Sequence, residues 1–114
     1  MSGALQGIRV LDLTTMVAGP VAAMMLGDQG ADAIKVESPA GDLMRRFAFG
    51  RNGMSASFLS CNRNKRSLAV DVKSADGLKI VQKLVVTADV LMHNFRPGAA
   101  ERRTLPTFGL SGFL

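Results

Sequence analysis

The stretch IRVLDLTTMVAGPVAAMMLGDQGADAIKVE, residues 8–37, decides the predicted fold. Two aliphatic and β-branched runs, Ile8–Leu13 and Ala31–Glu37, have the length and composition of β-strands. Between them, Pro20 suits the first turn of a helix, Ala and Met residues continue it, and Gly30 can end it. We therefore predict a strand, a helix and a second strand over these residues.

The same pattern recurs farther along the chain. Two more predicted strands are Leu68–Val72 and Ala88–Asn94. Between them, Ser74 is a candidate N-cap, and apolar residues follow at helical spacing. Repeated strand–helix–strand units are typical of the α/β class, so the predicted fold is a Rossmann-like parallel βαβ segment. The long connection before the third strand is predicted to contain a short helix around Ala56–Ser60.

Composition restricts the classes of partner. A chain of 114 residues that is 47% hydrophobic suits one small domain with a buried core. A single cysteine, Cys61, and an N-terminus without a secretory pattern favour a cytoplasmic protein. No apolar run has the length to span a membrane. We also expect no metal site. The net charge of +5 suits an anionic ligand, whereas the absence of Trp and Tyr disfavours nucleic acid.

The segment CNRNKRSLAVDVK places positive charge around the third predicted strand. In open α/β sheets, ligands bind beyond the carboxyl ends of the strands. Lys73 ends the predicted strand and therefore lies at that edge, together with the loops TTMVAGP, ESPAGD and NFRPG. Arg63, Lys65 and Arg66 instead enter the strand from its amino end. For these three cations, a ligand contact and a structural or solubility role remain equal alternatives.

Three motifs, in order, carry a family resemblance. LQGIRVLDLTTMVAGPVAAMMLGDQGADAIKVE, NRNKRSLAVDVK and ADVLMHNFRPG resemble the N-terminal part of the family III CoA-transferases. That family includes formyl-CoA and carnitine CoA-transferases and is related to the α-methylacyl-CoA racemases. The resemblance runs from Leu5 to about Arg102. It implies the opening segment of a CoA-binding Rossmann-like domain, incomplete relative to the full family fold, and an interlocked homodimer in full-length members.

The resemblance also implies a set of CoA-binding positions. These are Met16, Val17, Val70, Lys73, Asn94, Phe95 and Arg102. In the implied arrangement Lys73 and Arg102 contact CoA phosphates, and Val70 lines the adenine side. Asn94 and Phe95 flank the pantetheine, and Met16 and Val17 lie near the thioester. Ser38 stands where some members carry an Arg. Val17 replaces a Gln that assists formyl or oxalate transfer, which disfavours a formyl-CoA transferase.

The family's chemistry uses an aspartate that attacks the acyl-CoA thioester. A mixed anhydride forms first, then an enzyme-bound CoA thioester, and CoA finally passes to a carboxylic acid. This covalent route divides one difficult step into several easier ones. The resemblance implies that this aspartate lies downstream of the matching segment. We therefore expect no catalytic residue in this chain, and we expect the chain to be inactive alone. CoA and acyl-CoA are substrates, with no tightly bound cofactor. Asp12 is predicted to brace the loop after the first strand.

Two features of organisation remain expectations. Residues 1–101 form the predicted CoA-binding segment, and residues 102–114 form an atypical tail of the kind a truncation or frameshift produces. Two alternatives to a transferase segment stay open. One is a non-enzymatic nucleotide-binding or assembly module, and the other is a fragment similar to an α-methylacyl-CoA racemase. The acyl group and its acceptor are not specified by these residues.

Overall fold

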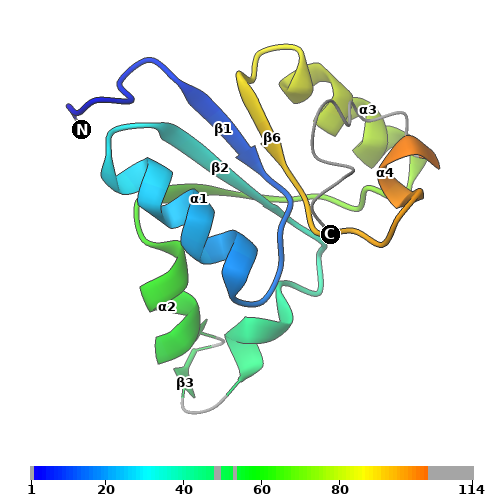
Figure 1. The fold of residues 1–114 in the computed structure, drawn as a ribbon. Coiled ribbons are helices and arrows are strands. Elements are labelled where there is room, and N and C mark those ends of the chain that lie inside the picture. The colour runs from blue at the N-terminus through cyan, green and yellow to red at the C-terminus, as the bar shows by residue number, and fades with distance from the viewer. Residues whose placement is uncertain (1, 48–49, 53, 103–114) are drawn as a thin grey trace.

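The computed structural model describes residues 2–47, 50–52 and 54–102, and within them the chain is mixed α/β (Figure 1). This class is the one that the sequence predicts. In chain order the elements are β1 (Arg9–Asp12), α1 (Ala18–Asp28), β2 (Asp32–Glu37), the 3-10 helix η1 (Leu43–Arg46), β3 (Gly50–Arg51), β4 (Met54–Ser55), α2 (Ala56–Asn62), β5 (Lys65–Ala69), α3 (Ala75–Val85), β6 (Val90–Met92) and α4 (Ala99–Arg102).

In the described part of the chain, a four-stranded parallel sheet has the order β5-β2-β1-β6. Counting only its own strands, the order is third, second, first, fourth, which is how doubly wound α/β sheets begin. The order reverses between β1 and β6, where Val10 pairs with Val90 and Asp12 pairs with Met92. Ligand sites in such sheets lie at this reversal, beyond the carboxyl ends of the strands.

The core lies on both faces of the sheet because successive strand residues point to opposite sides. Leu11 and Ile34 face one side, where they form a cluster with Val81 of α3. Val10 and Ala33 face the other side, where Leu26 of α1 packs against them. Figure 1 shows α1 and α3 on different sides of the sheet. Both faces are therefore covered by helices, as expected for parallel strands.

The helix boundaries follow the predicted signals. Pro20 lies in the first turn of α1, and Gly30, with a φ of +99°, follows the end of that helix. Ser74 caps α3, because its hydroxyl accepts a hydrogen bond from the Gly77 N–H at 3.0 Å. The predicted short helix is α2, which runs to Asn62.

The third strand was predicted at the wrong residues. It is Lys65–Ala69 instead of Leu68–Val72, so Lys65 and Arg66 lie inside the strand. Among the described strands, β5 pairs only with β2, and an edge strand accepts polar side chains that a central strand does not. Lys73 consequently does not end a strand, and it lies in the turn that leads to α3.

Two further predictions concern the ends and the surroundings of the chain. The proposed tail, residues 102–114, falls outside the described residues except for Arg102, the last residue of α4. The division into two segments therefore stays a prediction. No helix within residues 2–47, 50–52 and 54–102 is both long and apolar enough to cross a bilayer.

Candidate functional site

The loops that follow β1 and β6 meet at the carboxyl edge of the sheet. Asn94, after β6, accepts a hydrogen bond from the Thr15 N–H through Oδ1 at 3.1 Å. Its Nδ2 donates to the Thr15 carbonyl oxygen at 2.9 Å. One amide side chain thus satisfies both backbone groups of a residue 79 positions away. The two loops are held together at the point where the strand order reverses.

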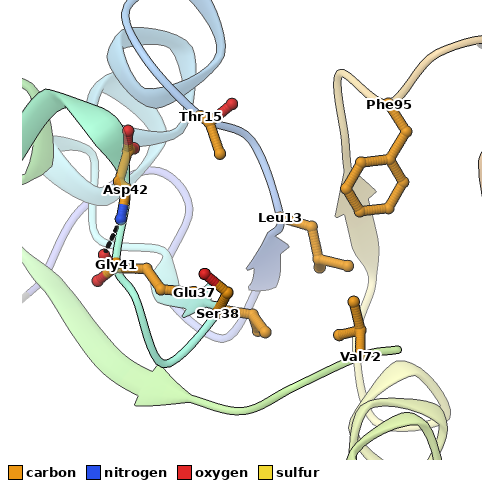
Figure 2. A pocket seen from close by; sticks show the side chains of 9 residues that line it. Leu13, Thr15, Glu37, Ser38, Gly41, Asp42, Val72 and Phe95 are labelled. Carbon is orange, nitrogen blue, oxygen red and sulfur yellow. Dashed lines mark hydrogen bonds between the residues drawn. The ribbon is translucent and has the colours of Figure 1, made fainter. Parts of the chain in front are cut away.

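A pocket of about 140 Å3 opens beside this junction (Figure 2). Its residues come from the loop after β1, the end of β2 with the loop that follows it, the segment after β5, and the loop after β6. They are Leu13, Thr15, Val36, Glu37, Ser38, Gly41, Asp42, Val72 and Phe95. Figure 2 shows the side chains of Leu13, Val72 and Phe95 gathered on one side, with Asp42 across the hollow. The pocket thus has an apolar wall opposite a polar rim.

Buried charges support the polar rim. Glu37 is 7% exposed, and its carboxylate accepts two hydrogen bonds from Arg45, at 2.8 and 2.7 Å. Burial tends to raise the pKa of Glu37, but the hydrogen bonds from Arg45 and from the Asp42 N–H outweigh it and lower the pKa below its ordinary value. The Arg45 guanidinium also stacks on the ring of Phe58, 3.9 Å from its centroid. These contacts anchor η1 and α2 to the end of β2.

A second buried pair lies beside the first. The Lys35 ammonium is 2.9 Å from Asp42 Oδ2, and the two side chains are 3% and 0% exposed. Burial alone would raise the pKa of Asp42, but hydrogen bonds from the Met44 N–H and Lys35 bring it below its ordinary value. The Asp42 carboxylate is therefore ionised at neutral pH.

The predicted CoA-binding residues fall into three groups. Asn94 and Phe95 lie at the pocket, the first as the clamp on Thr15 and the second in the apolar wall. Met16 and exposed Val17 belong to the adjoining β1–α1 loop. Val70 is 8% exposed and packs in the core cluster that lies behind the wall.

The two predicted phosphate contacts lie on exposed segments. Lys73 precedes α3, and Arg102 is the last residue of α4. Within the described residues, neither side chain forms an ion pair. Their contact with CoA phosphates stays a prediction.

The three cations before the third strand have different roles. Arg63 is largely exposed and binds Asp28 through two hydrogen bonds, at 3.1 and 2.7 Å. Arg66 binds Asp32 in the same bidentate way, at 3.0 and 2.8 Å. Each charge is therefore neutralised by a carboxylate of this chain. Of the two alternatives that the sequence left open, both arginines thus take the structural one.

Lys65 is buried, with its side chain 2% exposed. Its ammonium donates to Asp12 Oδ2 at 2.7 Å, to Asn62 Oδ1 at 2.8 Å and to the Pro20 carbonyl oxygen at 2.9 Å. Burial lowers the pKa of Lys65 from its ordinary value, while the hydrogen bond to Asp12 opposes that shift. Asp12 also accepts hydrogen bonds from the Thr14 N–H and hydroxyl, which confirms its predicted bracing role.

Sequence reasoning missed several residues of the site. Thr15 and Asp42 were seen only as members of the loops TTMVAGP and ESPAGD, and Lys35 and Glu37 only as parts of a strand. The loop positions after β1 and β2 were a usable signal for the first two. A charged residue inside an apolar strand was the signal for the others, since such a residue needs a buried partner. In the part of the chain that the structure describes, no cluster of His, Cys, Asp and Glu has the arrangement of a metal site.

Comparison with known proteins agrees with these observations. Residues 5–108 match the family described as CoA-transferase family III. Succinyl-CoA:glutarate CoA-transferase of Mus musculus is 50% identical over 96 residues, which cover 82% of this chain and 22% of the mouse protein. The alpha subunit of succinyl-CoA–L-malate CoA-transferase of Chloroflexus aurantiacus is 44% identical over 100 residues, which cover 85% of this chain and 23% of that subunit.

Solved structures give the same result. A CAIB/BAIF family protein from Brucella suis matches with a TM-score of 0.87 and 37% identity over 98% of this chain and 31% of its own. The hypothetical protein Rv3272 from Mycobacterium tuberculosis matches with a TM-score of 0.84 and 40% identity over 97% of this chain and 30% of its own. This chain thus spans 22–31% of the length of these four relatives. The resemblance carried by the three motifs is confirmed, and the chain belongs to CoA-transferase family III.

Proposed function

We propose that this chain forms the CoA-binding part of an acyl-CoA:carboxylate CoA-transferase. One observation carries the proposal. A pocket with an apolar wall lies at the carboxyl edge of a parallel sheet, where the strand order reverses, and two cations without ion pairs in the described residues follow the segments that line it. Apolar surface beside free positive charge suits CoA, which joins an adenine ring to phosphates and a long pantetheine arm.

The proposed placement of CoA follows the size and polarity of the pocket. A cavity of roughly 150 Å3 accommodates one benzene-sized ring, so the pocket, at about 140 Å3, can take one edge of the adenine while the rest of the cofactor lies outside it. Val72 contacts the ring and Val70 supports it from behind, whereas Phe95, in the same apolar wall, flanks the pantetheine together with Asn94. The 3′-phosphate and pyrophosphate are bound by Lys73 and Arg102. The pantetheine passes Asn94 towards the β1–α1 loop, where Met16 and Val17 lie near the thioester.

The chemistry of the whole enzyme is proposed from the family. The acyl donor is an acyl-CoA and the acceptor a carboxylic acid, as the names of the mouse and Chloroflexus relatives indicate for those proteins. The aspartate that attacks the thioester is supplied by sequence that this chain does not contain. The assembly is a homodimer of full-length chains. By itself this chain binds CoA and does not transfer it.

Calorimetry with CoA and dephospho-CoA tests the proposal. A charged contact to the 3′-phosphate makes CoA bind about tenfold or more tightly than dephospho-CoA. Lys73→Ala and Arg102→Ala should each weaken CoA binding, and at least one should reduce the difference between the two ligands. Lys79→Ala, an exposed lysine of α3, is the matched control and should change neither affinity. If neither CoA nor dephospho-CoA bound, CoA binding by this chain would be rejected. If both bound with equal affinity, the proposed contacts to the 3′-phosphate would be rejected.

A further inference from the structure

The β1–α1 loop is held by side chains from several other elements. At its start, the Thr14 carbonyl oxygen accepts a hydrogen bond from the Lys35 ammonium of β2 at 3.1 Å. Both backbone groups of Thr15 are bound by Asn94, as described above. The Met16 N–H lies 3.2 and 3.3 Å from the two carboxylate oxygens of Asp42. Three consecutive residues are thus fixed by groups that come from outside the loop.

Met16 is the strained member of this loop. Its φ is +73°, in the left-handed region that side chains other than glycine enter only at an energetic cost. In this conformation its N–H donates to Asp42, so the carboxylate offsets part of the cost. The strained turn directs the chain from pocket-lining Thr15 into Val17 and the first turn of α1.

Asp42 is itself fixed from every side. Its own N–H donates to Glu37 Oε2 at 2.7 Å, and its Oδ1 accepts from the Met44 N–H at 3.0 Å. Lys35 holds its other oxygen at 2.9 Å, and its side chain is fully buried. A carboxylate constrained in this way can impose a position on Met16 instead of following it.

We propose that Asp42, with Lys35 as its counter-ion, is a positioning residue that holds the β1–α1 loop in the conformation that receives CoA. The proposal rests on the proposed function, because the loop carries Thr15 at the pocket and Met16 at the expected thioester end. Asp42 acts through Met16 and need not touch the ligand. The affinity for CoA therefore depends on the Asp42–Lys35 pair in addition to what the pair contributes to folding stability.

The test combines Asp42→Asn with Met16→Gly. Asp42→Asn keeps the shape of the side chain but removes the charge and one acceptor. Glycine adopts a positive φ without strain, so Met16→Gly makes the loop conformation independent of the carboxylate. Asp32→Asn, which removes a carboxylate of β2 at a partly exposed site bound by two arginines, is the matched control. CoA dissociation constants are measured by calorimetry at a temperature where circular dichroism shows every variant folded.

The expected result is a dependence on background. Asp42→Asn should raise the dissociation constant about tenfold or more in the Met16 chain and about threefold or less in the Met16→Gly background. Asp32→Asn should leave it unchanged. A merely structural role of Asp42 would give equal losses in both backgrounds, because Lys35 lacks its counter-ion in each. Equal losses, or no loss, would overturn the proposal.

Amide hydrogen exchange separates this proposal from the proposed function. If the unmodified chain binds no CoA, the binding proposal fails, but the loop can still be examined. Asp42→Asn should then accelerate exchange of the Met16 amide at least about tenfold, while the Thr15 amide, bound by Asn94, changes less. Unchanged protection of Met16 would overturn the positioning role.

Discussion

Replacing Lys65 by Met removes a buried charge while it preserves most of the side-chain volume. The ammonium of Lys65 makes three hydrogen bonds of 2.7 to 2.9 Å, which join β5 to β1, α1 and α2. Asp12, its partner, is fully buried and would lose its counter-ion. The substitution therefore leaves an uncompensated carboxylate in the interior.

The expected cost follows from that burial. Removing one partner of a buried ion pair costs about 3–5 kcal/mol, because the remaining charge stays desolvated. Since small domains are stable by about 5–15 kcal/mol, Lys65→Met should remove a large fraction of the stability. The double substitution Lys65→Met with Asp12→Asn removes both charges and should recover much of the loss. Arg63→Met, which breaks an exposed pair, should leave stability close to the original.

Urea unfolding followed by circular dichroism measures these differences. The midpoint should fall strongly for Lys65→Met, rise again for the double variant and barely move for Arg63→Met, with similar slopes for all chains. If Lys65→Met cost less than about 1 kcal/mol, or if Arg63→Met cost as much, the buried pair would not be the stabilising element. A double variant no better than Lys65→Met would show that hydrogen bonds to Pro20 and Asn62 matter more than the charge of Asp12.

Three other outcomes are expected. The pKa values of Glu37 and Asp42 are lower in the folded than in the unfolded chain, so they stabilise the fold above about pH 4 and this contribution is lost as the pH falls through their folded values. A melting temperature that stayed constant from pH 7 to pH 3 would contradict this. Gly77→Ala should destabilise the chain by about 1–3 kcal/mol in urea unfolding, since its Cβ would collide with the Asp71 carbonyl oxygen, and an unchanged midpoint would contradict the packing of α3. The chain alone should show no CoA transfer from acyl-CoA to carboxylic acids and no acyl group trapped by hydroxylamine, whereas turnover abolished by a single Asp substitution would place the nucleophile within these residues.

The central part of the fold was predictable because its signals are local. The first two strands were predicted from aliphatic runs, and α1 from Pro20 near its start and Gly30 after its end. The helix α3 was predicted from its N-cap, Ser74. The third strand was misplaced because Lys65 and Arg66 read as a loop. They lie in a strand since Lys65 reaches a buried carboxylate and β5 is an edge strand among those described. Local propensity does not contain that information.

The site was only partly predictable for the same reason. Asn94 and Phe95 were expected in the loop after the fourth strand, where the structure has them, and Phe95 lines the pocket. Their contact with CoA stays a prediction. The ion pairs that organise the rim join residues far apart in the chain, as Lys65 and Asp12 do across 53 positions. Composition gives the sum of charges but not which charges meet. A surplus of cations therefore suggested an anion site where most of the clustered charge serves the fold.

The parallel pairing of Val10 with Val90 sets the order in which this chain can become functional during synthesis. At about 5–20 residues per second, a ribosome needs roughly 4–16 s to extend the chain from one to the other. Throughout that interval one edge of β1 has no strand beside it, and the backbone groups of Thr15 have no Asn94 to bind. The scaffold of β1, α1 and β2 can assemble early, but the candidate site is complete only when β6 docks. Exposure of that nascent edge is an aggregation hazard that ends at the same moment.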